Sequence, residues 1–445
     1  MTAVILKPST DEKLEILSTD AQYDLACACG TRDGEHRRRG GNGKWIYPVT
    51  LPNGGTSVLF KTLMSNNCHN DCKYCPLRAE NAVRRCNLGV DETARVFLDY
   101  FRRGEVFGLF LSSGVCGTPD ATMERLNGVA RRLRQRYKYR GYIHLKVIPG
   151  ASDAAVEEAV SLATAVSLNI ETPGAKYLAQ VSQRKDFMED IIRPIKLISR
   201  LTGKGMRYSR VKQTTQFIVG AAGESDAEIV RYMGGLYGRL GLQRVYFSAY
   251  QRGLGDPSLP GEAIGGDGAA KGGDARADAG ECGVIVGDRG VFGGDERGDG
   301  GEGRLFGSDR GSWRGDVGGS AGQMRLFADD DGQGGRDAFM REHRLYQVDF
   351  LLRRYGFKDD EIVFDEGGRL SLDCDPKEVW ARRHPEAFPV DVNRASKWDL
   401  LRVPGLGPRA VERILERRTA GRVNRIEEVG KVGRQLMKAR EYLVF

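Results

Sequence analysis

The sequence lacks the features of a membrane or secreted protein. No window approaches the ~18 uninterrupted apolar residues that a membrane-spanning helix requires, and the first residues turn polar before an apolar signal segment develops. Without a secretory signal, the nine cysteines predict reduced thiols and metal ligands rather than a disulfide framework. We therefore expect a cytoplasmic protein with no membrane partner.

One long stretch also lacks an apolar pattern. Residues 253–335 hold 27 of the 59 glycines, with 16 acidic against 8 basic side chains. Such a segment cannot bury enough surface to offset its chain entropy, so it predicts a disordered Gly/Asp-rich insertion. The other 362 residues then carry 60 basic and 44 acidic groups, a balance that is compatible with a polyanionic partner.

The most specific pattern is a cysteine motif. Cys68, Cys72 and Cys75 stand at C-x3-C-x2-C spacing, and three such thiolates can hold three irons of a [4Fe–4S] cluster. The fourth iron is then open to chelate S-adenosylmethionine and pass it an electron, which is radical SAM chemistry. A structural zinc site completed by His69 or Cys86 is the alternative, although neither spacing is usual for zinc.

The chain before the insertion alternates between strand-like and helix-like segments. Apolar runs predict six strands, at 57–64, 107–112, 142–148, 165–170, 214–219 and 244–248. Amphipathic patterns predict helices between them, near 91–104, 121–137, 153–163, 186–202 and 225–240. We therefore expect an α/β fold with a parallel sheet, a six-stranded partial (β/α)6 radical SAM barrel. Cys68 follows the first strand, at the end where parallel strands present functional groups.

Resemblance to radical SAM enzymes implies a cofactor pocket around this motif. Tyr74 stands just before the third cysteine, where these enzymes place an aromatic residue beside the adenine. Ser112, Ser113 and Gly114 end the second strand, where a small-residue motif, often Gly-Gly-Glu, meets the methionyl amino group. Because serines replace the glycines and no Glu follows, a simple tight turn is the alternative.

The later strands add candidate cofactor contacts. Asn169 and Glu171 close the fourth strand, where a ribose or carboxylate contact is expected, although Glu171 also suits a helix entry or an ion pair. Lys146 is either an inward polar group or a lysine that snorkels along the strand. The Gly220–Glu224 turn resembles the adenine-contacting glycine segment, and an ordinary βα loop is its alternative.

The end of the chain carries a pattern typical of DNA-binding hairpins. Val403-Pro404-Gly405-Leu406-Gly407 matches the helix-hairpin-helix pattern h-P-G-h-G, and a degenerate copy at 429–433 has Lys431 in place of a glycine. The glycines bring N–H groups within reach of a phosphate, and residues from 390 onward hold 13 basic against 7 acidic side chains. The predicted duplex DNA contacts are Gly405, Gly407, Arg409, Lys431 and Gly433. Arg402 and Arg413 are expected to add charge to the phosphate contact together with Arg409. An αα-hairpin used for packing is the alternative.

With these motifs, the chain resembles the radical SAM proteins assigned to DNA modification or repair, whose genes tend to accompany a uracil-DNA-glycosylase-like protein. The expected domains are an N-terminal extension (1–55), the barrel (56–252), the insertion (253–335), a helical connector (336–389) and a small all-α tandem helix-hairpin-helix domain (390–445). The resemblance implies hydrogen abstraction from a DNA nucleotide. An RNA-modifying radical SAM enzyme and a non-catalytic Fe–S DNA-binding sensor are the alternatives, and no residue is assigned a catalytic role.

Two further segments carry weaker signals. Gln323-Met324-Arg325-Leu326-Phe327 resembles the peptide that docks on bacterial sliding clamps, a short pattern that also occurs by chance. Cys27 and Cys29 suit ordinary thiols better than ligands of a second cluster.

Overall fold

The structure is a computed structural model, and it describes residues 8–21, 45–50, 56–263 and 333–445. Some sequence predictions fall outside these residues: those on Cys27 and Cys29, the clamp-like Gln323–Phe327 segment and most of the insertion. None of the helices in the described ranges is long and apolar enough to cross a membrane.

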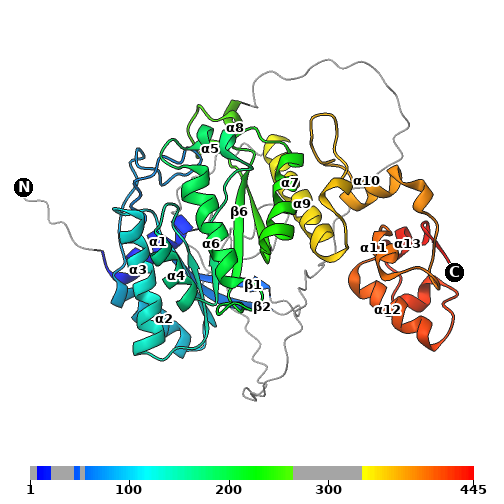
Figure 1. Ribbon diagram of the computed structural model, residues 1–445, viewed down its shortest axis with the longest axis horizontal. Helices are drawn as coiled ribbons and strands as arrows, with labels where there is room; N and C mark the ends of the chain where they lie inside the picture. Colours follow the sequence, from blue (N-terminus) through cyan, green and yellow to red (C-terminus); the bar gives the residue numbers. More distant parts are fainter. Residues whose placement is uncertain (1–7, 22–44, 51–55, 264–332) are drawn as a thin grey trace, which may run out of the picture.

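A curved sheet of seven strands organises the larger part of the molecule (Figure 1). In spatial order the strands are β1 (Ile46–Thr50), β2 (Thr56–Leu63), β3 (Gly108–Ser112), β4 (Tyr142–Lys146), β5 (Ala165–Ser167), β6 (Lys212–Val219) and β7 (Arg244–Ala249). β2 to β7 pair in parallel and lie where the six strands were predicted. β5 is shorter than predicted, since it ends at Ser167 and leaves Asn169 and Glu171 in the segment that follows it. The observed sheet has one strand more than the six that were predicted, because β1 pairs with β2 in antiparallel fashion. β1 is five residues long and contains a proline, which only an edge strand tolerates and which weakens its sequence signal.

Helices cover one face of this sheet and build its core. They are α1 (Thr10–Asp20), α2 (Val90–Arg102), α3 (Pro119–Arg131), α4 (Asp153–Leu162), α5 (Ala175–Val181), α6 (Arg193–Thr202) and α7 (Asp226–Leu240). The short α8 (Pro260–Ala263) lies instead at the carboxyl end of the strands, where the Gly261 N–H donates to the Ala221 carbonyl at 3.2 Å. Leu111 of β3 and Leu145 of β4 are fully buried in the core that these helices share. Lys61, Lys146 and Ser167 are buried as well, but they point to the opposite face because side chains alternate along a strand. The other face of the sheet is therefore partly polar.

Helix α9 (Gln333–Arg354) covers the open edge of the sheet at β7. The Tyr346 hydroxyl donates to the carbonyl of Phe247 and accepts from its N–H, both at 3.0 Å, and Glu342 accepts from the N–H of Ala249 at 2.6 Å. These contacts satisfy backbone groups that an edge strand would otherwise expose. The segment after the insertion is thus part of the barrel architecture.

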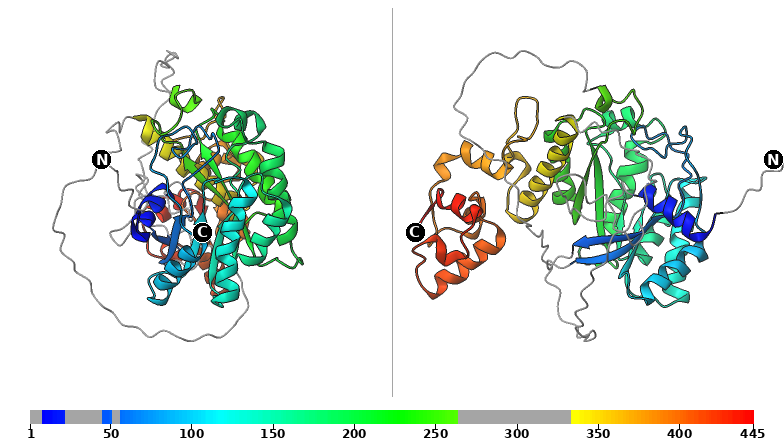
Figure 2. Two further views of the ribbon diagram at one scale, coloured as in Figure 1. Left: turned by 90° about the vertical axis from the view of Figure 1, so that its left-hand side faces the viewer. Right: turned by 180° about the vertical axis from the view of Figure 1, so that it is seen from behind.

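A smaller unit follows α9, on the side of the molecule away from α1 (Figure 2). It contains α10 (Pro376–Arg383), β8 (Val390–Asp391), α11 (Lys397–Arg402), α12 (Pro408–Ala420), α13 (Arg434–Arg440) and β9 (Leu443–Val444), with short 3-10 turns at Asp359–Glu361, Pro385–Ala387 and Ile426–Val429. From Val390 onward its apolar residues form a core of their own. The unit is not all-α as predicted, since β8 and β9 pair in parallel.

The ends of the predicted insertion are folded, which corrects its boundaries. Residues 253–263 include α8, and Asp256 donates its N–H to the Lys73 carbonyl at 2.8 Å. At the other end, α9 already begins at Gln333. Glycine content marked this segment, but pairing of its first residues with the cysteine loop depends on tertiary contacts that composition does not report.

Candidate cluster and cofactor site

The three motif cysteines lie in one loop at the carboxyl end of β2. Backbone hydrogen bonds tie this loop to two neighbours: His69 N–H donates to Val115 O at 2.9 Å, and Lys73 N–H donates to Val181 O at 2.8 Å. Cys75 N–H donates to Cys72 O at 2.8 Å, which turns the loop back on itself. The loop is therefore held at the strand ends, as the sequence predicted for Cys68.

Burial and neighbouring charges shift the pKa values of two of the motif thiols. Burial raises the pKa of Cys72, and the nearby Lys185 ammonium opposes that rise. Burial also raises the pKa of Cys75, with Cys72 adding to the effect. A metal ion bound by these thiols would favour their thiolate forms and displace the protons.

The zinc alternative finds no support in the geometry. Among the described residues, no three His, Cys, Asp or Glu side chains are arranged to hold a metal ion. His69 Nδ1 instead lies 3.1 Å from the carbonyl oxygen of Gly117, and Cys86 is buried in the core. Ligands of one zinc ion must converge on one point, whereas cluster ligands bind different irons and stand farther apart.

Gly114 lies directly beneath the cysteine loop. A Cβ at this position would meet the Asn67 carbonyl oxygen at 2.5 Å and the Cys68 Cβ at 3.2 Å. Its N–H also donates to Ser65 O at 2.7 Å. Ser112 is the buried last residue of β3, and the Ser113 hydroxyl donates to Gly114 O at 2.7 Å. The predicted small-residue strand end is therefore adjacent to the cysteines, and a larger residue would not fit at Gly114.

Glu171 is buried beside the cysteine loop, with strained backbone geometry. Its φ of +65° lies in the left-handed region, which non-glycine residues adopt at a cost and which often marks functional sites. Its Oε1 lies 3.5 Å from Lys185 Nζ, and both side chains are less than a tenth exposed. Within the described residues, its Oε2 is buried and has no hydrogen-bond partner. A buried carboxylate oxygen of this kind suits an acceptor for a bound polar ligand.

Lys185 is the site residue that sequence reasoning missed. Burial alone would lower the pKa of its ammonium, but Cys72 and Glu171 raise it overall. In the sequence it belongs to the polar run 183–186, which is typical of an exposed loop. The Gln183 N–H donates to the Asp71 carboxylate at 2.9 Å and ties that loop to the cysteine loop. This tertiary contact buries Lys185 beside the cysteines.

The remaining predicted cofactor contacts cluster around the same strand ends. Tyr74 packs against the core, and burial, Cys72 and Glu171 together raise the pKa of its hydroxyl well above its usual value. Lys146 is inward-facing and buried, and its ammonium donates to the Asn169 side-chain oxygen. The structure thus brings the predicted cysteines and pocket residues to one edge of the sheet, and their roles toward the cofactor stay predictions.

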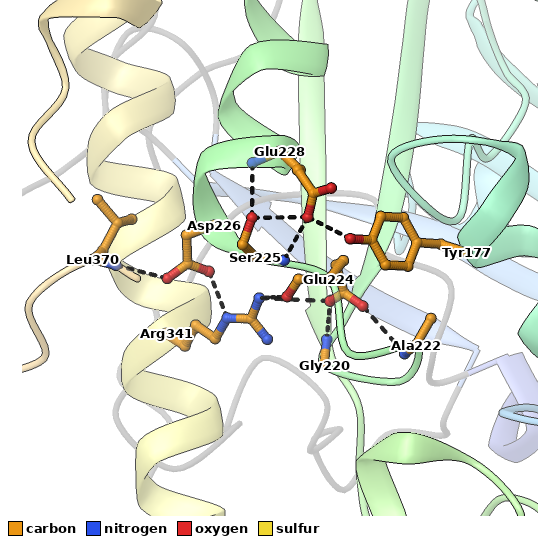
Figure 3. Close-up of polar contacts among 9 residues, drawn as sticks. All are labelled: Tyr177, Gly220, Ala222, Glu224, Ser225, Asp226, Glu228, Arg341 and Leu370. Atoms are coloured by element: carbon orange, nitrogen blue, oxygen red, sulfur yellow. Dashed lines mark hydrogen bonds and ion pairs between the residues drawn. The ribbon is translucent and has the colours of Figure 1, made fainter. Parts of the chain in front are cut away.

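The loop after β6 is fixed by buried charges (Figure 3). The fully buried Glu224 accepts N–H groups from Gly220 and Ala222. Arg341 of α9 donates to the Glu224 carbonyl at 2.7 Å and pairs with Asp226 at 2.5 Å. The predicted adenine-contacting segment is therefore a rigid turn, and α9 helps to hold it.

The C-terminal hairpin residues form two turns, and each turn packs against a helix of the other hairpin. Gly405 has φ +85°, and a Cβ there would meet the Gln435 carbonyl oxygen of α13 at 2.1 Å. A Cβ at Gly430 would meet Arg413 of α12 at 2.4 Å. Gly407 and Gly433 are the N-caps of α12 and α13.

The charged residues of the hairpins divide into two kinds. Arg409 and Lys431 are exposed, as a phosphate contact requires. Arg402, expected to add charge to that contact, instead pairs with Glu361 at 2.8 Å and lies over the rings of Phe357 and Trp380. It joins the hairpin to the connector and is not available to a phosphate.

Comparison with known proteins recognises the barrel. The pattern of the Radical SAM superfamily matches residues 62–234, and no curated protein matches the chain. A radical SAM superfamily domain is therefore present, in a family of enzymes that use a [4Fe–4S] cluster and S-adenosylmethionine. The match includes the three cysteines and the strand ends described above.

Solved structures give weak overall likenesses. The FeFe-hydrogenase maturase HydG from Carboxydothermus hydrogenoformans is 16% identical, with a TM-score of 0.37 over 44% of this chain and 46% of HydG. Methylornithine synthase (PylB) is 14% identical, with a TM-score of 0.38 over 57% of this chain and 70% of PylB. Streptococcus suis SuiB bound to S-adenosylmethionine is 12% identical, with a TM-score of 0.35 over 45% and 43% of the two chains. The chain thus spans less than half of HydG, and we draw no function from these likenesses.

Proposed function

We propose that this chain is a radical SAM enzyme that acts on duplex DNA. The observation that carries the proposal is the joining of two parts in one molecule. A cysteine loop sits at the strand ends of a radical SAM domain, and the chain continues into a basic unit with two glycine turns at helix starts. The first part supplies radical chemistry, and the second suits a polyanion.

In this proposal the chain's own residues hold and orient the cofactors. Cys68, Cys72 and Cys75 would bind the cluster, and the buried Oε2 of Glu171 would accept a hydrogen bond from the S-adenosylmethionine. Gly114 lets the loop that carries Cys68 pack closely on the end of β3, since a Cβ there would meet the Asn67 carbonyl oxygen at 2.5 Å. When bound, the cluster and S-adenosylmethionine supply a 5′-deoxyadenosyl radical that takes a hydrogen atom from the substrate.

The C-terminal unit supplies the affinity for DNA. In the described part of the chain, the N–H groups of Gly405 and Gly407 make no hydrogen bond, so both are available to a phosphate. Exposed Arg409 and Lys431 add charge to contacts of this kind, which carry little sequence information. A target base inside a duplex must be flipped out or already unpaired to reach the barrel.

The cluster assignment is tested with anaerobically reconstituted protein, reductant and S-adenosylmethionine. We expect release of 5′-deoxyadenosine, and we expect Cys72→Ser to lower it at least about 100-fold because the cluster loses a ligand. Cys116→Ser is the matched control, since Cys116 lies outside the motif, and it should retain activity. Cluster-loaded wild type that never cleaves S-adenosylmethionine, even with DNA present, identifies a non-catalytic sensor.

The nucleic-acid assignment is tested separately. Competition binding with a duplex DNA and a structured RNA of equal length is expected to favour the DNA. Mass spectrometry of nucleosides from defined duplexes incubated with active enzyme would identify the modified or repaired position. Preferential binding and modification of RNA would replace the proposal with an RNA-modifying enzyme.

A further inference from the structure

Lys377 is a buried lysine that the cofactor site does not use. It lies in the first turn of α10, and only 7% of its surface is exposed. Burying an ammonium group costs free energy unless hydrogen bonds or charges compensate for it. Burial lowers the pKa of Lys377 to about 7, and Asp375 acts in the opposite direction. The hydrogen bonds and the ring contact of its amine therefore indicate the structural role of Lys377.

Both hydrogen bonds of the amine go to carbonyl oxygens beside the first hairpin turn. Nζ donates to Leu401 O at 3.0 Å and to Leu406 O at 2.6 Å. Leu401 lies in the last turn of α11, where helix carbonyls lack helical partners and the helix dipole is negative. Converging carbonyl oxygens are a ligand set for a cation. The ring of Tyr355, 4.6 Å from Nζ, adds a cation–π contact.

The same turn carries the donors that the proposed DNA contact needs. Gly405 lies between the two carbonyls that Lys377 holds, and Gly407 directly follows the second. With those carbonyls fixed on the amine, the turn keeps its conformation while its two glycine N–H groups stay unpaired within the described residues. Loss of the amine would leave two buried carbonyls unsatisfied, and the turn would rearrange to pair them.

A chain of contacts also links Lys377 to the half-barrel. Asp375 caps α10 by accepting the Lys377 N–H at 2.9 Å, and its other oxygen accepts from the Gln347 side chain of α9 at 2.6 Å. α9 in turn pairs with the edge of the sheet. The hairpin turn is therefore anchored to the element that borders the catalytic domain.

We propose that Lys377 is a positioning residue for the DNA contact, an internal cation that holds the first hairpin turn in its phosphate-binding conformation. The inference rests on the proposed action on DNA and adds to it how the hairpin is shaped. Lys377 itself touches no phosphate in this arrangement. Lys377 therefore changes how tightly the turn binds a phosphate, and not how many phosphates the protein contacts.

The test measures binding of the full chain to a fluorescent DNA duplex across a range of salt concentrations. We expect Lys377→Met to weaken binding about tenfold or more without changing the slope of log affinity against log salt. Arg409→Ala, which removes a phosphate contact, should lower that slope by about 0.9. Lys196→Met, an exposed lysine on α6, is the control for losing one positive charge.

A pH series provides a readout that a purely structural role would not move. Wild-type affinity should fall as the pH rises from about 6 to 8.5, because the amine loses its proton near pH 7 and its two hydrogen bonds lose the strength that the charge gives them. Lys377→Met should not share this fall. Asp375 and Tyr355 are the groups that act on or contact the amine. Other charged groups on neighbouring elements pair with each other, Glu378 with Arg382 and Lys438 and Arg402 with Glu361. They are unchanged in the variant, so the difference between the two profiles isolates Lys377.

The outcomes separate the two proposals. If wild type binds no duplex, the DNA function fails and the role of Lys377 fails with it. If wild type binds and folded Lys377→Met binds equally well at every pH, only the positioning role is wrong. Lys377→Gln, which can still donate hydrogen bonds but carries no charge, serves if the methionine variant does not fold. The DNA affinity of Lys377→Gln should lie between those of wild type and Lys377→Met and should not depend on pH. The inference is overturned if Lys377→Gln binds with the affinity and the pH dependence of wild type.

Discussion

At the residue scale, the absence of a side chain at Gly114 allows the cysteine loop to pack against the end of β3. An added Cβ would lie 2.5 Å from the Asn67 carbonyl oxygen, and backbone at that distance must move. We expect Gly114→Ala to displace the loop that carries Cys68. Iron content per chain after reconstitution should fall by at least half, and the melting temperature should drop by several degrees.

Gly238 offers the matched control for this substitution. It lies within α7, and a Cβ there would meet nothing within 4 Å. Gly238→Ala should therefore keep full iron loading and gain about 0.5–1 kcal/mol of stability from helix propensity. Equal iron content in the two variants would show that the cysteine loop does not depend on the close approach at Gly114.

Single residues differ in how far the sequence reveals them. Cys68, Cys72 and Cys75 could be recognised because their spacing is itself the signal. Lys185 and Lys377 could not be recognised, since a lysine is expected to be exposed until the packing around it is known. Each is buried by a segment distant in sequence, and each is held by partners that no local pattern reports.

At the element scale, α9 joins the segment after the insertion to the turn that follows β6. Arg341 is 12% exposed and compensates two carboxylates, Glu224 and Asp226, which are at most 1% exposed. Arg341→Met would leave both acids without this cation in a low-dielectric site. We expect a loss of about 3–5 kcal/mol in the free energy of unfolding, measured by urea denaturation at neutral pH.

An exposed arginine on the neighbouring helix serves as the reference. Arg231 lies on the surface of α7, so Arg231→Met should change the unfolding free energy by no more than about 0.5 kcal/mol. A destabilisation of similar size in both variants would mean that the buried network in Figure 3 contributes little to holding α9.

Elements were predictable where a pattern of one period persisted over several residues. β2 to β7 and most of the helices between them followed their apolar periodicity. The seven-residue α5 was not predicted. β1, β8 and β9 were missed because two to five residues at an edge do not establish a pattern. Arg402 was placed on the wrong contact for a related reason, since its partner Glu361 belongs to the connector and not to the hairpin.

At the scale of the whole molecule, the charge is unevenly distributed along the chain. Residues 264–332 hold 14 acidic and 8 basic side chains, whereas the complete chain is net positive by 8. If the chain binds duplex DNA as proposed, a negative segment within it competes with the duplex for the basic surface and repels the phosphates. The segment is therefore expected to weaken DNA binding at low ionic strength.

Replacing residues 264–332 with a short Gly/Ser linker tests this expectation on an otherwise complete chain. We expect the duplex affinity to rise several-fold at about 50 mM salt, and the gain to fade near 300 mM because screening shortens the range of the repulsion. A linker of equal length that keeps the acidic residues but replaces the glycines with serine should bind as wild type does, which separates charge from flexibility. If the shortened chain binds more weakly at low salt, the segment contributes to DNA binding instead of opposing it.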